Sequence, residues 1–519
     1  MNGRMLTSLA VFLCFTGIFF FDSMAQKTVD ENIVLGKPTK SSVLVHMLVA
    51  VGTEVAVEYG PGSGVYTDKT DAIYSAADGV TDIAIVNLTE NTRYFYRVNY
   101  RAPGESSYRV GEEYTFHTQR TKGSSFSFGV QGDSHPERLG RMYSPDLYAR
   151  TMERVAGDRP DLYFMLGDDF SISNQLPNYF QGDRSTLTQS FVDDIYINQR
   201  RFLGIMANST ALFLVNGNHE EARRSLLGTP LHDVSIFAGR ARNRYFPVPT
   251  PDDFYTGNPE PVDGIGLLGD YFAFEWGDAL FISLDPYWHS PRVTEPIGGM
   301  GTSSASLGQQ PSANVGGMGV GMGMGQGIKP WAEIADDWAA LTRSTGNLWH
   351  STIGDAQHEW LKRTLEGSDT KYKFVFTHHV LGTGRGGIER AIRYEWGGYT
   401  DEGVWEFDKE RPHWELPIHQ LMVKHDVTIF FQAHDHLFAR QELDGIIYQS
   451  VPNPADETHG DLIVNANAYL SGDILDNSGY LNVTVSPGQV KVDYIRSYLP
   501  EHEVGGREHG EVAYSYTID

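Results

Sequence analysis

Five short polar motifs, each placed just after an apolar, β-rich run, constrain the fold of this chain more than any other feature. The motifs are Asp133-Ser134-His135, Gly167-Asp168-Asp169, Gly217-Asn218-His219-Glu220, His378-His379 and Ala433-His434-Asp435-His436. The runs before them cover 126–130, 162–166, 211–215, 372–376 and 427–431. Open α/β sheets place their functional sites at the C-terminal ends of their strands. The spacing therefore predicts one site built from all five motifs.

Together the motifs supply oxygen and nitrogen ligands for two metal ions. The candidate ligands are Asp133, His135, Asp168, Asn218, His378, His434 and His436. Asp168 follows a strand and a glycine, so its carboxylate can project from a tight turn and bridge two cations. In the first and last motifs the two ligands are two residues apart, and such side chains point the same way on an extended chain. One bridge among these ligands gives each metal several protein contacts and leaves positions open for water and substrate.

The first 25 residues have the pattern of a secretory signal peptide. Arg4 precedes an apolar run over 9–21, and Ser23-Met24-Ala25 supplies small residues before a cleavage site at Gln26. The alternative is an uncleaved anchor, although the run is shorter than the roughly 20 residues of a membrane span. Cleavage would leave a secreted or periplasmic chain with no membrane span. It would also remove Cys14, the only cysteine, and with it any disulfide or thiolate ligand.

The acidic composition narrows the range of partners. The chain carries a formal net charge of −25, which argues against nucleic acid because little here would neutralise a phosphate backbone. Solubility is the simplest consequence of such acidity. A small phosphate ester would need local positive charge from metal ions and a few arginines.

Residues 28–120 are predicted to form an all-β sandwich. Strand-like runs cover 43–51, 53–59, 81–88, 93–100 and 113–118, with turn sequences at 60–62 and 103–104. Short strands at this spacing are typical of a sandwich. Segment 88–98 resembles the penultimate-strand region of fibronectin type III domains. The simpler interpretation is a well-packed β-domain with no binding role.

From residue 121 the pattern alternates between strands and helices. Helices are predicted over 145–156, 187–206, 355–366 and 418–424, and a hairpin joins strands at 271–275 and 279–284. Further strands are expected at 446–450, 480–485 and 489–494. We therefore predict an α/β fold over 121–500, a four-layer α/β/β/α sandwich of two mixed sheets, with a C-terminal tail at 501–519.

Residues 297–327 stand apart because they are rich in glycine and methionine. Such a composition cannot bury a core, so the segment is predicted to be a flexible insertion. Methionine thioethers could instead bind a soft metal such as copper.

The five motifs, in this order, resemble the calcineurin-like metallophosphoesterase superfamily over roughly residues 121 to 500. That pattern is Asp-x-His, Gly-Asp, Gly-Asn-His-Asp/Glu, a His after a strand and Gly-His-x-His, with Ala433 here in place of the last glycine. The resemblance implies that one metal is held by Asp133, His135, Asp168 and His436. It implies that the other is held by Asp168, Asn218, His378 and His434.

A β-domain in front of this region resembles the layout of plant-type purple acid phosphatases, but the ligands differ. Those enzymes have a metal-binding tyrosine three residues after the bridging aspartate, where this chain has Ser171. They lack the histidine of the first motif, which here is His135. One ligand is lost and one is gained, so tyrosinate-to-iron colour is not expected. The cysteine-free mature chain also argues against the related alkaline phosphatases that fix iron with a thiolate.

The resemblance implies a secreted, binuclear-metal-dependent phosphatase that hydrolyses phosphomonoesters, similar to acid phosphatases. Two cations about 3.5–4 Å apart would hold a hydroxide that attacks phosphorus in line. Carboxylate, imidazole and amide ligands suit iron, manganese and zinc alike. A phosphodiesterase is the close alternative, because the same metals serve both reactions. A catalytically silent extracellular binding protein on this scaffold is the alternative from another class.

Two histidines beside the ligands are candidates for substrate contact. His219 is expected to be catalytic, as the acid or electrostatic partner of the leaving group, with a structural role behind the ligands as the alternative. His379 would contact substrate if His378 is the ligand, as the family pattern favours. Asp168 is assigned to catalysis as well as to metal binding.

Charged side chains near the motifs complete the predicted site. Arg385, on a glycine-rich loop, could clamp a phosphate oxygen or simply face solvent, and Arg138 is a weaker candidate for the same task. Asp169 and Glu220 are predicted to orient the ligating groups from a second layer.

Overall fold

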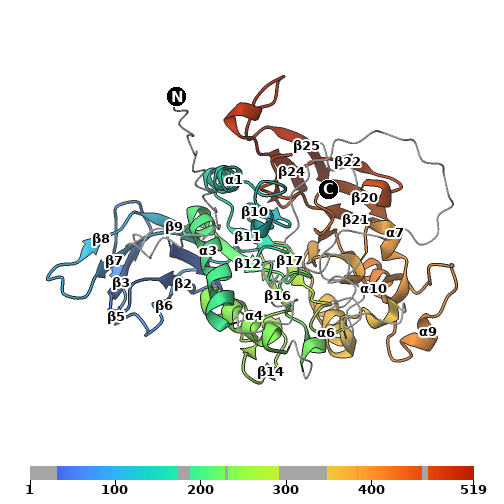
Figure 1. Ribbon diagram of the computed structural model, residues 1–519, viewed down its shortest axis with the longest axis horizontal. Coiled ribbons are helices and arrows are strands. Elements are labelled where there is room, and N and C mark those ends of the chain that lie inside the picture. Colours follow the sequence, from blue (N-terminus) through green and yellow to red (C-terminus); the bar gives the residue numbers. More distant parts are fainter. Residues whose placement is uncertain (1–31, 173–187, 228–231, 291–347, 383, 459–465) are drawn as a thin grey trace, which may run out of the picture.

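A computed structural model describes residues 32–172, 188–227, 232–290, 348–382, 384–458 and 466–519. A small β-domain lies at one end of the molecule, beside a larger α/β body (Figure 1). The predicted signal peptide and the segment 297–327 lie outside the described residues. Within the residues described, no helix combines the length and the apolar character that crossing a membrane requires.

The N-terminal domain consists of two β-sheets, which agrees with a sandwich. One sheet has the order β1-β2-β6, and the other is built around β3 and β7. Its strands are β1 (Ile33–Gly36), β2 (Val43–Leu48), β3 (Glu54–Gly60), β4 (Asp68–Lys69), β5 (Ile73–Tyr74), β6 (Val80–Ile85), β7 (Arg93–Arg101), β8 (Arg109–Val110) and β9 (Tyr114–His117). Val45, Val57 and Val98 belong to the apolar core of this domain. Strand β1 was not predicted, because four residues are too few to show a strand period.

Two larger sheets form the centre of the α/β body. The first has the order β12-β11-β10-β23-β24-β25, and the second has the order β13-β16-β17-β18-β19-β21-β20-β22. The first contains β10 (Phe126–Gln131), β11 (Leu162–Met165), β12 (Ala211–Leu214), β23 (Gly479–Val485), β24 (Val490–Arg496) and β25 (Val512–Ile518). The second contains β13 (Thr256–Gly257), β16 (Phe272–Trp276), β17 (Ala279–Ser283), β18 (Tyr372–Phe376), β19 (Ile429–Gln432), β20 (Phe438–Leu443), β21 (Ile446–Ser450) and β22 (Asp473–Leu475). A separate pair, β14 (Pro261–Val262) and β15 (Gly266–Leu267), lies outside both sheets.

Parallel pairing gives the functional strands a common edge. Strands β10, β11 and β12 are parallel neighbours in the first sheet, and β17, β18 and β19 are parallel neighbours in the second. Phenylalanines fill the space between the sheets. The rings of Phe164 and Phe376 stack with their centroids 4.2 Å apart, and Phe128 packs against Phe374 at 5.1 Å. Aromatic packing across the two inner faces therefore holds the sheets together.

Helices cover the outer faces and complete the four layers. The first sheet is covered by α1 (Pro145–Asp158), α3 (Gln189–Ala207) and α4 (His232–Tyr245). The second is covered by α6 (Gly354–Gly367) and α10 (Ile418–Lys424), with the short helices α7 (Ile388–Ala391), α8 (Tyr394–Gly397) and α9 (Phe407–Glu410) on the same side. Short 3₁₀ turns are η2 (Pro136–Arg138), η5 (Arg224–Leu226), η6 (Leu348–His350), η7 (Val380–Gly382), η8 (Ala466–Ala468) and η9 (Pro500–His502). The predicted α/β/β/α architecture is confirmed.

The C-terminal segment differs from its prediction as a tail. Strand β25 lies within 501–519 and pairs antiparallel with β24, so the first sheet continues to Ile518. Its residues are only partly buried, because β25 is the edge strand of this sheet. A half-exposed edge strand has a weak apolar pattern, which is why the sequence did not predict it.

The β-domain packs closely against helix α3. Arg200 of this helix is fully buried, and its guanidinium donates to the backbone carbonyls of Asn32, His46 and Tyr245. Tyr96 of β7 donates from its hydroxyl to the carbonyl of Asn208 at 2.6 Å. These hydrogen bonds join the two parts of the chain in addition to apolar contact.

Candidate metal centre

The five motifs meet at one edge of the α/β body. They follow β10, β11 and β12 of the first sheet and β18 and β19 of the second. The candidate ligands are between 0% and 5% exposed. Polar side chains buried so deeply need partners, because an unpaired polar group away from water is costly.

One group of ligand atoms comes from Asp133, His135 and His436, and all three atoms lie within 4.8 Å of one another. Nε2 of His135 lies 3.1 Å from Nε2 of His436, which in turn is 3.4 Å from Oδ1 of Asp133. Two imidazole nitrogens at this distance cannot both carry protons. At least one lone pair therefore points into the group.

A second group is formed by Asp168, His378 and His434, and Asn218 joins it. Nε2 of His378 lies 3.0 Å from Oδ1 of Asn218, 3.1 Å from Nδ1 of His434 and 3.3 Å from Oδ2 of Asp168. One ring nitrogen carries at most one proton, so it cannot satisfy several acceptors. The same Oδ2 of Asp168 is 3.7 Å from Nε2 of His135, so this oxygen lies between the two groups.

Each carboxylate keeps one oxygen for the cluster. Oδ2 of Asp133 accepts a hydrogen bond from the backbone N–H of His434 at 2.7 Å, whereas Oδ1 is buried with no hydrogen-bond partner among the described residues. Oδ1 of Asp168 accepts from the backbone N–H of His219 at 2.8 Å, which leaves Oδ2 facing the histidines. Backbone amides thus fix the orientation of both side chains.

Hydrogen bonds on the outer ring nitrogens set the tautomers of two histidines. Nδ1 of His378 donates to the carbonyl of Leu166 at 2.8 Å, so Nε2 is the ring nitrogen that would offer a lone pair to a metal ion. Nδ1 of His135 lies 3.0 Å from Oε1 of Glu137, which has the same effect. This is the arrangement in which imidazole binds a metal ion, and these residues could hold one in each group.

The electrostatics at this point favour a cation. Against the effect of burial, the neighbouring His378 and His219 hold the pKa of the Asp168 carboxyl well below its usual range. Although burial opposes it, the carboxylates of Asp168 and Asp133 raise the pKa of His378 to about 10. Without metal ions, the positive charge of His378 offsets the negative charge of the two carboxylates. Bound metal ions would neutralise that charge instead.

Four candidate ligands occupy left-handed backbone conformations, which residues other than glycine rarely adopt. The φ angles are 48° at His135, 59° at Asp168, 68° at His434 and 52° at His436. Such conformations cost of order 1–3 kcal/mol each and persist where the surrounding structure enforces them. Their concentration in one cluster makes it the candidate functional site.

Two motif glycines allow the turns after β11 and β12 to touch. A Cβ on Gly167, whose φ is +96°, would lie 2.3 Å from the backbone nitrogen of Gly217. A Cβ on Gly217 would lie 2.3 Å from Oδ1 of Asp168. Only glycine permits this approach, and the approach brings Asp168 beside the following motif.

Glu220 lies beneath the Asp168 turn. Its carboxylate accepts hydrogen bonds from four backbone N–H groups, those of Asp168, Asp169, Phe170 and Gly217, at 2.7–3.0 Å. Asp169 accepts from Nε2 of Gln131 at 2.9 Å and from the backbone of Ser134. These contacts are suited to the predicted orienting roles of Asp169 and Glu220.

His219 and Arg138 lie at the side of the cluster. Nε2 of His219 is 3.8 Å from Oδ2 of Asp168, and its ring packs edge-on against His135 with centroids 5.1 Å apart. Nη2 of Arg138 is 3.5 Å from Nε2 of His219. The weaker candidate of the two arginines is therefore the one beside the predicted catalytic histidine.

His379 and Arg385 pack against the turn formed by His434 and Asp435. The His379 ring is fully buried, 5.0 Å from the His434 ring, and its Nε2 is 3.9 Å from Oδ2 of Asp435. Nη1 of Arg385 donates to the carbonyl of His434 and, at 3.0 Å, to Oδ1 of Asp435. In this structure both side chains contact the turn that carries a ligand, and their contact with substrate stays a prediction.

Two contacts of His135 were not predicted from the sequence. Besides Glu137, its Nδ1 lies 3.2 Å from Oγ of Ser171. Ser171 stands where the purple enzymes have their tyrosine, so it meets the histidine that those enzymes lack. The sequence did offer one sign of the Glu137 contact, because Glu137 follows the candidate ligand His135 by two residues.

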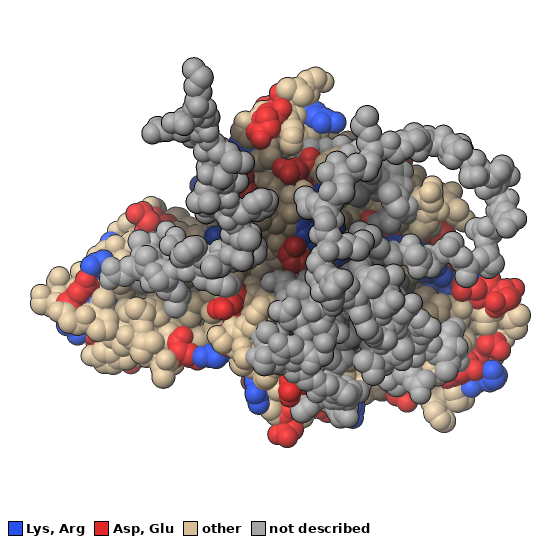
Figure 2. Space-filling view, viewed as in Figure 1, with Lys and Arg blue, Asp and Glu red and all other residues tan. Residues whose placement is uncertain are grey.

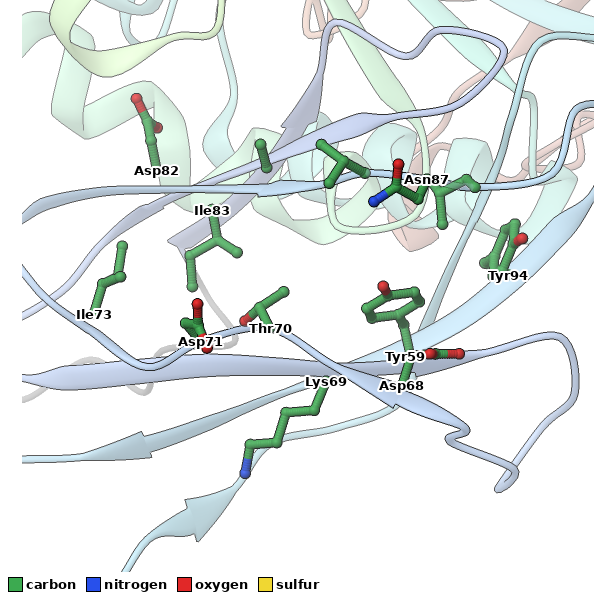
Figure 3. A pocket seen from close by; sticks show the side chains of 13 residues that line it. Tyr59, Asp68, Lys69, Thr70, Asp71, Ile73, Asp82, Ile83, Asn87 and Tyr94 are labelled. Carbon is green, nitrogen blue, oxygen red and sulfur yellow. The ribbon is translucent and has the colours of Figure 1, made fainter.

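A groove of about 500 Å³ lies elsewhere, in the β-domain (Figure 3). Residues of β6 such as Asp82 and Ile83 line one side, and Asp68, Lys69 and Thr70 line the other. Its lining contains no residue of the five motifs. The groove is therefore separate from the candidate metal centre.

The described residues on the face shown in Figure 2 have lysines and arginines scattered among aspartates and glutamates. A continuous basic surface, which a nucleic-acid backbone would require, is not formed by the described residues of that face. This distribution accords with the net charge of −25.

Comparisons with known proteins support the fold. No protein-family model matches the sequence, and no curated protein matches it either. A solved structure of PhoD is similar, with a TM-score of 0.60 and 13% identity, covering 95% of this chain and 91% of that one. A putative 5'-nucleotidase from Staphylococcus aureus gives a TM-score of 0.32 and 14% identity, covering 72% of this chain and 54% of that one. The likeness to PhoD shows the fold, a mixed α/β body preceded by a β-rich region.

Proposed function

We propose that this protein is a metal-dependent phosphoric ester hydrolase that acts on phosphomonoesters. The observation that carries the proposal is the set of buried ligand groups that surround the Asp168 carboxylate. More nitrogen and oxygen acceptors meet there than the ring protons can satisfy. The fold shared with PhoD supports the same proposal.

The residues present fit two metal ions. Asp133, His135, Asp168 and His436 would hold one, and Asp168, Asn218, His378 and His434 would hold the other. Iron, manganese or zinc suits this donor set, because it combines carboxylate, imidazole and amide groups without thiolate. When bound, the ions would polarise the phosphoryl group and lower the pKa of a water molecule.

The protein's own groups would orient the ester and assist the leaving group. Burial lowers the pKa of His219 to about 3, so its imidazole is neutral near neutral pH. A neutral imidazole still carries one N–H, which can donate to the leaving oxygen or to a phosphoryl oxygen. Asp133 and Asp168 are held by backbone amides, so the site is arranged before substrate enters.

We propose that this activity lies outside the cytoplasm, in a secreted or periplasmic protein, and the predicted signal peptide supports this proposal. The substrate would be a small phosphate ester. A phosphodiesterase that uses the same metal ligands is the close alternative. The other alternative is a binding protein in which these residues hold metal ions but catalyse no reaction.

The test combines elemental analysis with substrate assays. The purified protein is stripped with a chelator, reloaded with iron, manganese or zinc, and assayed with 4-nitrophenyl phosphate and bis(4-nitrophenyl) phosphate. We expect about two metal ions per chain and faster hydrolysis of the monoester. The matched variant Asp168→Asn should lose metal and activity together. Two bound metals with no hydrolysis of any phosphate ester would refute the enzyme, and preference for the diester would select the alternative.

A further inference from the structure

Arg138 has a position that the proposed function does not yet use. It is the last residue of the 3₁₀ turn η2, which begins directly after His135. Its Nη2 lies 3.5 Å from Nε2 of His219, and that nitrogen lies 3.8 Å from the shared oxygen of Asp168. The His219 ring thus lies between the guanidinium and the Asp168 carboxylate. The Arg138 side chain is 15% exposed.

A neighbouring acid holds this guanidinium in place. Oε1 of Glu137 lies 3.3 Å from Nε of Arg138 and 3.0 Å from Nδ1 of His135. The Glu137 side chain is only 4% exposed, so the contact is shielded from water. Glu137 therefore connects the first candidate ligand to Arg138, and the arginine is fixed relative to the cluster.

Arg385 is a weaker match for a phosphate contact. Its Nη1 already donates to the carbonyl of His434 and to Oδ1 of Asp435. Asp435 in addition accepts from the backbone N–H of Gly386 at 2.8 Å and from the Tyr469 hydroxyl at 2.6 Å. The geometry assigns Arg385 to the support of the His434 turn and leaves the substrate contact to Arg138.

The chemistry of phosphate esters gives this assignment a consequence. A phosphomonoester has three non-bridging oxygens that share its negative charge, whereas a diester has two and carries a second organic group in the remaining direction. Two metal ions account for two oxygens, and the third needs a separate cation or hydrogen-bond donor. Arginine offers a fork of N–H donors that suits such an oxygen.

We propose that Arg138, together with His219, binds the third non-bridging oxygen of a phosphomonoester and thereby gives the site its preference for monoesters. This inference rests on the proposed function and names the residue that selects its substrate class. The second ester group of a diester, in the same direction, is uncharged. It would form no ion pair with the guanidinium and would clash with it.

The experiment measures the ratio of kcat/KM for 4-nitrophenyl phosphate to that for bis(4-nitrophenyl) phosphate, per bound metal ion. Arg138→Gln should lower the monoester value roughly 10- to 100-fold, the effect of losing a hydrogen bond to a charged group, and the diester value by less than about threefold. Arg138→Lys, which keeps the charge, should recover part of the loss. Arg141→Gln, an exposed arginine three residues further on, is the matched control and should leave both values unchanged.

A binding measurement makes the result independent of turnover. Inorganic phosphate, titrated calorimetrically into the metal-loaded protein, should bind about tenfold more weakly to Arg138→Gln than to the wild type. Elemental analysis should show the same metal content in both proteins.

The outcomes separate this inference from the proposed function. Equal losses on both substrates, or unchanged phosphate affinity, would overturn the role of Arg138 and leave a hydrolase. Loss of metal in Arg138→Gln with an unchanged substrate ratio per metal would assign the arginine to structure alone. No hydrolysis of either ester by the wild type would overturn the proposed function itself.

Discussion

At the scale of single residues, the site is held together by backbone groups as much as by side chains. The carboxylates of Asp133 and Asp168 each use one oxygen on an amide N–H, so the other can face the histidines. Glu220 collects four amides beneath the Asp168 turn, where the chain adopts a φ of 59°. The strain of that conformation is offset by the hydrogen bonds that surround it.

Replacing Glu220 with glutamine tests this support. Glutamine has one acceptor oxygen in place of two, and its NH₂ would face amide donors, so we expect a loss of roughly 2–4 kcal/mol in the free energy of unfolding. Metal affinity should also fall, because Asp168 would lose its fixed orientation. Urea denaturation and metal titration measure the two effects, with the exposed Glu153→Gln as control. Unchanged stability and unchanged metal affinity would contradict the prediction.

His219 forms a further group of possible ligand atoms with His135 and Asp168, and we assign it to catalysis rather than to metal binding. We expect His219→Ala to lower turnover by about 100-fold or more while metal content stays close to that of the wild type, because general acid groups typically contribute this much. Steady-state kinetics and elemental analysis on the same samples check it. Loss of metal with normal turnover per metal ion would sink the assignment.

At the scale of elements, strand ends carry the ligands and helices support the sheets from outside. The buried side chain of His358 in helix α6 is an example of a contact on this outer face. His358 stacks on Trp414 with ring centroids 3.8 Å apart, and its Nε2 lies 3.1 Å from the carbonyl of Leu416. Burial lowers the pKa of His358 to about 4, so the folded protein keeps this imidazole neutral in mild acid.

The stability of the protein should therefore fall as the pH drops from about 6.5 towards 4. In that window the unfolded chain binds a proton at His358 and the folded chain does not, so unfolding becomes easier by about 2 kcal/mol between pH 7 and pH 5. His358→Gln keeps a donor for Leu416 but cannot titrate, and it should show a smaller change over this range. Denaturation of metal-free protein at both pH values measures the difference, with the exposed His413→Gln as control. Identical pH dependence in wild type and His358→Gln would disprove the prediction.

At the scale of the whole molecule, the β-domain and the α/β body are joined at helix α3. Arg200 lies fully buried at the junction and donates to three backbone carbonyls, two from the β-domain or its approach and one from the end of α4. Burial lowers the pKa of this guanidinium to about 9, which shows how little water reaches it. The junction thus includes one buried charged side chain whose two terminal nitrogens donate to backbone carbonyls.

Replacing Arg200 with methionine should loosen this junction. The apolar side chain keeps most of the volume but removes the guanidinium donor from three buried carbonyls, at a cost of roughly 2–5 kcal/mol. We expect faster amide hydrogen exchange in β1 and β2 and earlier proteolytic release of the β-domain. Arg201→Met, on the exposed side of the same helix, should behave as the wild type. Unaltered exchange in β1 and β2 would show that apolar packing alone holds the domains.

Much of the architecture could be predicted from local patterns. The apolar runs before the motifs became β10, β11, β12, β18 and β19. The helices expected at 145–156 and 355–366 became α1 and α6, with a difference of at most two residues at any end. Strand β25 could not be predicted, because a half-exposed edge strand owes its structure to its neighbour β24 rather than to its own pattern.

The same division applies to the candidate site. The sequence by itself determined which residues carry metal-binding chemistry and that they follow strands, because both properties belong to neighbouring residues of one segment. Only the tertiary structure decided that Glu220 supports the Asp168 turn, that Ser171 meets His135 and that Arg138 rather than Arg385 lies beside His219. Those contacts join residues that are 36 to 81 positions apart. They depend on how the strands pair and how the turns pack, and no local spacing encodes that arrangement.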